Sequence, residues 1–213
     1  MWGLVHTAIL VVMTQFSTFF AGVIKIHYLL FIQIIAPNLS LTKSASTMND
    51  AQTIQAFSKI INCEKCNSQT ASFLLRDRQK NLPQPGYIGS KYQRTRLLLI
   101  GQNPGICPPP MIVEDTKYMR ALLDLAKYPT QDNYQTLYGI LLNFIPSWPV
   151  QRNHFPLQAL GLGLEDIAYC NVIRCRTENN KKPNKNLTQN CIEEHLLSFI
   201  DLVDPSVIVF IGK

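Results

Sequence analysis

The sequence predicts an α/β fold in which a central, mostly parallel sheet is flanked by helices. Short apolar runs at 96–100, 167–173 and 207–211 alternate with segments whose apolar residues recur at helical spacing. Such runs are typical of parallel strands buried on both faces, and their alternation with helices favours crossovers within one sheet. The chain has 213 residues, of which 46% are hydrophobic, so it can form one domain with a substantial core.

The remaining elements follow from apolar spacing and from the positions of Pro and Gly. Helices are predicted over 51–61, 117–127 and 187–203, where apolar residues recur every three or four positions. Residues 76–96 are polar and punctuated by Pro and Gly, which indicates a loop. Residues 128–160 hold many prolines and aromatics and suggest a loop with short helices. The last strand would leave a partly uncovered sheet edge.

Residues 1–47 differ in composition and form a hydrophobic N-terminal extension to a domain at 48–213. The stretch Ala8 to Ile24 is uncharged, and the extension contains no Asp or Glu. It is either a membrane segment, since about 20 apolar residues can cross a bilayer, or the product of a start assigned too early, with Met48 as the true start. We expect a cytoplasmic protein, associated with a membrane only if residues 1–36 are translated and inserted.

Four of the six cysteines have a spacing typical of metal sites. Cys63 and Cys66 form a C-x-x-C pair, and Cys175 and Cys191 lie 16 positions apart much further along the chain. Disulfide-rich secreted domains have few core residues, whereas this chain has many. A metal or cluster in a reducing compartment is therefore favoured over disulfides. Four thiolates suit either tetrahedral zinc or a 4Fe–4S cluster, and buried free cysteine is the alternative.

A second motif, Gly101-Gln102-Asn103-Pro104-Gly105, directly follows the strand at 96–100. Ligands of open α/β sheets bind beyond the carboxyl ends of strands, where glycine permits close approach and proline stiffens the turn. The pentapeptide is therefore either one wall of a ligand cleft or a tight turn without chemistry.

The strand at 167–173 contains Asn171 and is followed by basic residues. An Asn side chain carries both a donor and an acceptor, so it can read the edge of a pyrimidine; the alternative is an Asn that caps a turn. The net charge of +6 is compatible with a nucleic-acid partner without establishing one. The candidates for phosphate contacts, or for a solvated basic loop, are Arg174, Arg176, Lys181, Lys182 and Lys185.

Taken together, these motifs resemble the iron–sulfur (family 4-like) branch of the uracil-DNA glycosylase superfamily over residues 51–213. That branch has an early C-x-x-C and a strand ending in a G-E-A-P-G-like motif. A strand of the form N-V-V-K-C-R-P-P-x-N-R-x-P follows, with a further cysteine 16 positions after the one in K-C-R. The matching places here are Cys63 with Cys66, residues 101–105, residues 171–176 with Asn180 and Pro183, and Cys191.

The resemblance implies a DNA repair glycosylase that hydrolyses the N-glycosidic bond of uracil, or a related deaminated base, after flipping the nucleotide. It implies a 4Fe–4S cluster, with zinc as the alternative metal, and DNA containing a damaged base as the partner, with no obligate protein partner. The cluster ligands would be Cys63, Cys66, Cys175 and Cys191. The base pocket would include Gly101, Gly105 and Asn171, with Tyr118 as the candidate for stacking on the base.

Two departures from the family pattern bear on catalysis. The motif has Gln102 in place of Glu and Asn103 at its third position, as in branches whose motifs read G-I-N-P-G or G-M-N-P-G. The catalytic candidates are Asn103 and Gln102. An amide cannot deprotonate water near neutral pH, so Asn103 would position the water without general-base help, which is typically worth about 10²–10⁴-fold. The family's later H-P-S-like motif does not occur before Lys213, so we expect the domain to be C-terminally incomplete relative to the family.

Three other interpretations remain open at this point. A catalytically degenerate module would keep the fold and the cluster and bind nucleic acid without cleaving it. A structural zinc protein would have no connection with DNA. A membrane protein would use the apolar N-terminal extension as its anchor.

Overall fold

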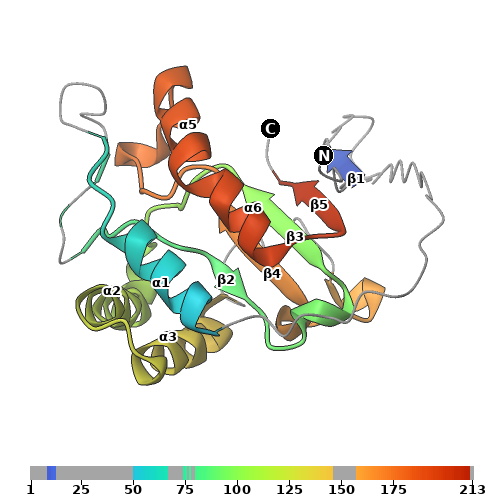
Figure 1. Ribbon diagram of the computed structural model, residues 1–213. Coiled ribbons are helices and arrows are strands. Elements are labelled where there is room, and N and C mark those ends of the chain that lie inside the picture. Colours follow the sequence, from blue (N-terminus) through green and yellow to red (C-terminus); the bar gives the residue numbers. More distant parts are fainter. Residues whose placement is uncertain are drawn as a thin grey trace, which may run out of the picture.

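The computed structural model describes residues 9–12, 50–66, 74–75, 77, 80–145 and 157–211, which form one sheet with flanking helices (Figure 1). The sheet has five strands in the order β1-β5-β3-β4-β2. Pairing is parallel throughout, except that β2 runs antiparallel to β4. The prediction of a mostly parallel α/β sheet is therefore confirmed. The strands are β1 (Ile9–Val12), β2 (Tyr87–Ile88), β3 (Leu97–Gly101), β4 (Ile167–Asn171) and β5 (Val207–Phe210).

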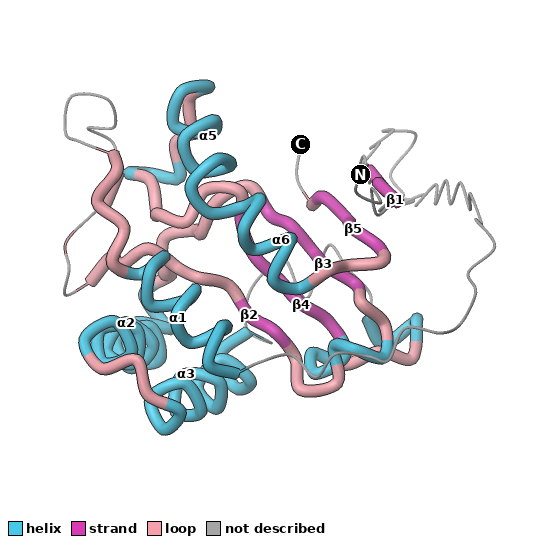
Figure 2. Tube along the Cα trace, in the orientation of Figure 1, coloured by secondary structure: helices cyan, strands magenta, loops and turns pink. Residues whose placement is uncertain are grey.

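The helices pack around this sheet (Figure 2). The helix predicted over 187–203 is divided into three parts, because a π-helical turn at Ile192–Leu196 separates α5 from α6. The α-helices are α1 (Asp50–Ile61), α2 (Ile112–Lys127), α3 (Gln131–Phe144), α5 (Lys185–Cys191) and α6 (Leu197–Val203). Short 3-10 helices lie at Tyr92–Arg94, Pro109–Met111, Leu157–Leu160, Leu164–Asp166 and Glu178–Asn180.

Helix α3 occupies a segment that the sequence predicted to be a loop with short helices, so that prediction was wrong. Thr130 caps the helix, its side chain accepting a hydrogen bond from the backbone N–H of Asn133 at 3.3 Å. The buried residues of α3 recur three or four positions apart and form one apolar face: Tyr134, Leu137, Leu141 and Phe144. Pro129 precedes the helix and the next proline in the sequence is Pro146, so no proline interrupts the helical period.

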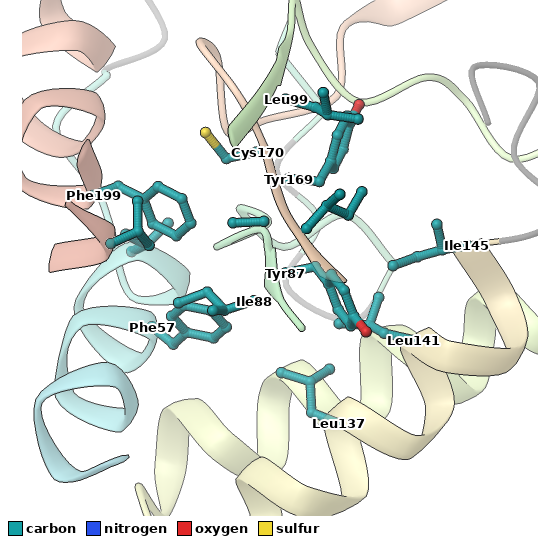
Figure 3. Packing of buried hydrophobic residues seen from close by; sticks show 14 of the residues in the cluster. Phe57, Tyr87, Ile88, Leu99, Leu137, Leu141, Ile145, Tyr169, Cys170 and Phe199 are labelled. Carbon is teal, nitrogen blue, oxygen red and sulfur yellow. The ribbon is translucent and has the colours of Figure 1, made fainter. Parts of the chain in front are cut away.

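Both faces of the sheet are buried. Leu98, Leu99 and Ile100 of β3 are fully buried, although successive residues of a strand point to opposite faces. On β4, Cys170 projects on the side of Phe199 and Tyr169 on the side of Ile145 (Figure 3). Because helices cover both faces, a ligand can reach the sheet at the ends of its strands.

The edge of β5 is paired, contrary to the expectation of an uncovered edge. Residues 9–12 form β1 and run parallel to β5, with Ile9 opposite Val207 and Val12 opposite Phe210. The rest of the N-terminal extension and its boundary at residue 48 lie outside the described residues, so both interpretations of the extension stay predictions. Within the described ranges, no helix has the length and apolarity needed to cross a membrane.

Phe57 of α1 links helices on different sides of the core. Its ring centroid lies 5.7 Å from that of Tyr134 in α3 and 6.3 Å from that of Phe199 in α6. Since the side chain is 1% exposed, we expect Phe57→Ala to lower the free energy of unfolding by about 3–5 kcal/mol, measured by urea denaturation. Gln55→Ala, on the exposed face of the same helix, should change it by less than about 0.5 kcal/mol. Equal effects of the two substitutions would contradict this packing.

Candidate functional site

A cavity of about 500 Å³ lies at the carboxyl ends of β3 and β4. The loop that follows β3 supplies one wall, and residues at and beyond the end of β4 supply another. The predicted site residues Gln102, Asn103, Gly105 and Asn171 all line the cavity, and other residues line it with them. Of these, Pro104 and Asn180 belong to the motifs named above, and Arg176 had been assigned to phosphate contacts. The remaining lining residues are Gln84, Ile106, Cys107, Pro108, Met111, Phe144 and Tyr169.

Backbone hydrogen bonds hold the two walls against each other beyond the ends of the strands. Val172 N–H donates to the carbonyl of Gly101 at 2.9 Å, and Ile173 N–H donates to the carbonyl of Gln102 at 3.0 Å. Further out, Ile106 N–H donates to Oδ1 of Asn180 at 2.9 Å. The loop after β3 is therefore fixed to the segment after β4 at three places.

Asn171 is held at the base of the cavity by a neighbour on the same strand. The Tyr169 hydroxyl donates to Asn171 Oδ1 at 3.0 Å, and both side chains are buried. Gly101 lies opposite Asn171 in the β3–β4 register. A Cβ at position 101 would overlap Asn171 Oδ1 and lie 2.7 Å from the Tyr169 hydroxyl oxygen. The side-chain pair therefore requires glycine at position 101.

Asn103 is oriented by hydrogen bonds from its amide nitrogen. Nδ2 donates to the carbonyl of Pro104 at 3.2 Å and to Oγ1 of Thr177 at 3.3 Å. Thr177 is completely buried, which makes it a rigid partner. With Nδ2 engaged, Oδ1 is the atom of Asn103 that can accept a hydrogen bond from a water molecule in the cavity. Gln102, beside it, is exposed.

Phe144 and Tyr169 are the aromatic residues in the lining of this cavity, and the predicted Tyr118 is not among the lining residues. Tyr118 is 1% exposed in α2, and its ring packs behind Phe144 with centroids 5.7 Å apart. We therefore replace Tyr118 by Phe144 as the candidate for stacking on a ligand. The helical spacing of apolar residues in 131–144 is the sequence signal that could have identified Phe144.

Arg174 and Arg176 were assigned to an exposed basic rim, and the structure requires a correction because both are buried. Arg176 makes a two-pronged ion pair with Asp115, with Nη1 2.8 Å from Oδ2 and a second contact from Nη2 to Oδ1. Burial alone would lower the pKa of Arg176, but the Asp115 carboxylate raises it, so the guanidinium stays charged.

The Arg174 guanidinium also lies in the interior, next to Pro85 and Phe199. Nη1 donates to the carbonyl of Pro85 at 2.9 Å, and the group lies 5.0 Å from the centroid of the Phe199 ring. A side chain with 1% exposure cannot contact DNA phosphates at the surface. Lys181 and Lys182 are exposed, as predicted for a basic rim, and follow directly after Asn180 of the cavity.

Three of the four predicted cysteine ligands meet in a small apolar cluster apart from the main core. Cys66, Cys175 and Cys191 pack there with Leu74, Ile173 and Leu187. A hydrogen bond with Cys66, burial, and the nearby Cys175 thiol raise the pKa of Cys191. Cys63 lies three residues before Cys66 and is half-buried, outside this cluster.

The chemistry of this donor set fits a metal cluster. In the described part of the chain, no three Cys, His, Asp or Glu side chains are arranged to hold a metal ion as they stand. The hydrogen bond with Cys66 and burial favour the protonated form of the Cys191 thiol, whereas a bound cation would favour the thiolate form. Soft thiolates are the ligands of iron–sulfur clusters, and no observation in the described residues supports zinc.

The comparison with known proteins agrees with the motifs. The chain is 38% identical over 125 residues to the Type-4 uracil-DNA glycosylase of Thermotoga maritima, an alignment that covers 59% of this chain and 49% of the relative. The resemblance to the type-4 uracil-DNA glycosylases is thereby confirmed. The chain spans about half the length of this curated relative, and no protein-family model matches it.

The need for glycine beside the Tyr169–Asn171 pair can be tested by stability. Gly101→Ala should lower the free energy of unfolding by about 1–3 kcal/mol, because the new methyl group displaces two buried polar side chains. Gly139→Ala in α3 is the matched control: a Cβ there meets nothing within 4 Å, so the change should be neutral or stabilise by up to about 1 kcal/mol. Urea denaturation of both variants measures this, and a neutral Gly101→Ala would contradict the close approach.

Proposed function

We propose that this chain is a glycosylase that hydrolyses the N-glycosidic bond of uracil, or of a related deaminated base, in DNA. One observation carries the proposal: Asn103 and Asn171, from two separate motifs, line the same cavity at the ends of adjacent parallel strands. The similarity to a type-4 uracil-DNA glycosylase supports the same reaction.

The cavity offers the groups needed to bind a flipped pyrimidine. Its volume of about 500 Å³ is within the range of small-molecule sites. The base would stack on Phe144, while Asn171 pairs with the ring edge that distinguishes uracil from cytosine. Flipping requires the base to leave its stack, so contacts of this kind must offset a cost of a few kcal/mol.

Hydrolysis would depend on Asn103 through the water that it holds. Asn103 Oδ1 accepts a hydrogen bond from the water, which places the water oxygen for attack on C1′ of the sugar. The glycosidic bond breaks with its electron pair going to the base, and the sugar passes through an oxocarbenium-like state that the water captures. The water's proton passes to solvent after attack, because an amide cannot remove it beforehand, so the reaction should be slower than with a carboxylate base.

Phosphate contacts are assigned to the exposed lysines. Lys181 and Lys182 lie next to Asn180 at the cavity, and Lys185 follows at the start of α5. Lys181 also pairs with Glu178 at 2.8 Å, an exposed contact that DNA phosphate can replace at little cost. Arg174 and Arg176 have no place in this interface because both are buried.

The resident cofactor would be a 4Fe–4S cluster held by Cys63, Cys66, Cys175 and Cys191. When bound, it would order the segment between Cys175 and Cys191 and take no part in the bond cleavage. Thiolate ligation of this kind requires a reducing compartment, which agrees with a cytoplasmic location.

Metal analysis tests the ligand assignment. Protein purified without oxygen should contain about four irons per chain and absorb near 400 nm. Cys191→Ala should lose the iron, whereas Cys107→Ala, which removes a thiol outside the cluster, should retain it. One zinc per chain would instead favour the structural zinc protein.

The catalytic assignment predicts the behaviour of Asn103→Ala. The chain should release uracil from single- or double-stranded DNA, and Asn103→Ala should lower kcat by about 10²-fold with the fold intact, because the water loses its anchor. Gln135→Ala, an exposed amide on α3, should leave kcat unchanged. Iron-loaded protein that binds uracil-containing DNA without releasing the base would favour the catalytically degenerate module.

A further inference from the structure

We propose that Tyr169 is a positioning residue that sets the amide orientation of Asn171 and so determines the preference for uracil over cytosine. The inference rests on the proposed function, because it concerns how the same cavity reads its base. It starts from the hydrogen bond that the Tyr169 hydroxyl donates to Asn171 Oδ1 at 3.0 Å.

The position of Tyr169 is fixed by the sheet. Tyr169 and Asn171 are two residues apart on β4, so their side chains lie on the same face. Tyr169 is paired on one side with Leu99 of β3 and on the other with Tyr87 of β2. Its side chain is 5% exposed, which leaves the ring little freedom to move.

The space around the pair is equally restricted. The backbone of Gly101 lies so close that a single added carbon would overlap Asn171 Oδ1. The two side chains therefore occupy a restricted slot against the backbone at the end of β3. A hydroxyl fixed in such a slot can select one of the two orientations of the neighbouring amide.

The chemistry of the hydroxyl favours the observed orientation. A phenol is a better hydrogen-bond donor than acceptor, because its ring withdraws electron density from the oxygen. Burial raises the pKa of Tyr169, so the group keeps its proton at neutral pH. The hydroxyl consequently favours Oδ1 of Asn171 as its neighbour over Nδ2, which has only protons to offer.

This orientation matches uracil and opposes cytosine. Nδ2 of Asn171 can donate to O4 of uracil, while the second lone pair of Oδ1 accepts from N3–H. Cytosine presents an amino group and an unprotonated N3 at the same places, which sets donor against donor and acceptor against acceptor. If the Asn171 amide could rotate to exchange the places of Oδ1 and Nδ2, it would accept cytosine. The specificity therefore depends on the contacts that hold the amide in one orientation.

The test is binding of non-cleavable DNA by the full chain. Oligonucleotides containing 2′-fluoro-2′-deoxyuridine or 2′-fluoro-2′-deoxycytidine resist cleavage, so the ratio of their Kd values reports base reading without catalysis. Tyr169→Phe should reduce the uracil preference about tenfold, the value expected for one hydrogen bond. Tyr92→Phe, which removes a buried hydroxyl without a partner in the described residues, should leave the ratio unchanged.

A double substitution separates an action through Asn171 from a direct contact with the base. In the Asn171→Leu background, Tyr169→Phe should no longer change the ratio, because no amide remains to be oriented. An effect that persists in that background, or an unchanged ratio in Tyr169→Phe alone, overturns the inference and leaves the proposed function standing. A native chain that shows no preference for the uracil analogue overturns the proposed function itself.

Discussion

The close approach of β3 and β4 at their carboxyl ends is the constraint on which the candidate site depends. Gly101 has no side chain, so the strand backbone can lie against the Tyr169–Asn171 pair. Beyond the end of β3, backbone hydrogen bonds to the carbonyls of Gly101 and Gln102 continue the β3–β4 pairing. They hold the loop after β3 beside the segment after β4. A larger residue at position 101 would separate the two segments that supply the cavity's polar groups.

Two buried arginines help to hold the segment after β4 in place. Arg176 lines the cavity, yet its guanidinium is committed to Asp115 of α2, so the pair fixes the segment after β4 to a helix. Arg174 makes a similar connection to Pro85 and Phe199 on the opposite side. Breaking a buried ion pair costs more than breaking an exposed one, so the Arg176–Asp115 pair stabilises the position of the segment. Neither arginine is exposed enough to contact phosphate.

The sequence predicted the parts of the fold and site that local pattern determines. Apolar runs located β3, β4 and β5. The turn motif placed Asn103 after a strand and the second apolar run contained Asn171, and the sheet brings the two residues together. Phe144 was not predicted because the surrounding prolines suggested a loop in place of helix α3. Thr177 was not predicted because an isolated threonine belongs to no recognisable motif. The arginines were misplaced because charge alone does not reveal burial; their partners Asp115 and Pro85 lie 61 and 89 residues away.

The cysteine cluster and the cavity share one segment of chain, so a restraint on one bears on the other. Between Cys175 and Cys191 lie Thr177, which binds the Asn103 amide, and Asn180, which binds the Ile106 backbone. Thr177 and Asn180, which contact the loop after β3, therefore lie on a stretch of chain that has a predicted cluster cysteine at each end. Asn179 and Asn180 also have left-handed backbone conformations, which need support from their surroundings. Anchoring the two cysteines limits the freedom of this stretch, and through Thr177 that restraint reaches the residue proposed to hold the water. An iron–sulfur cluster held by these cysteines would in this way determine whether the proposed chemistry occurs, without taking part in it.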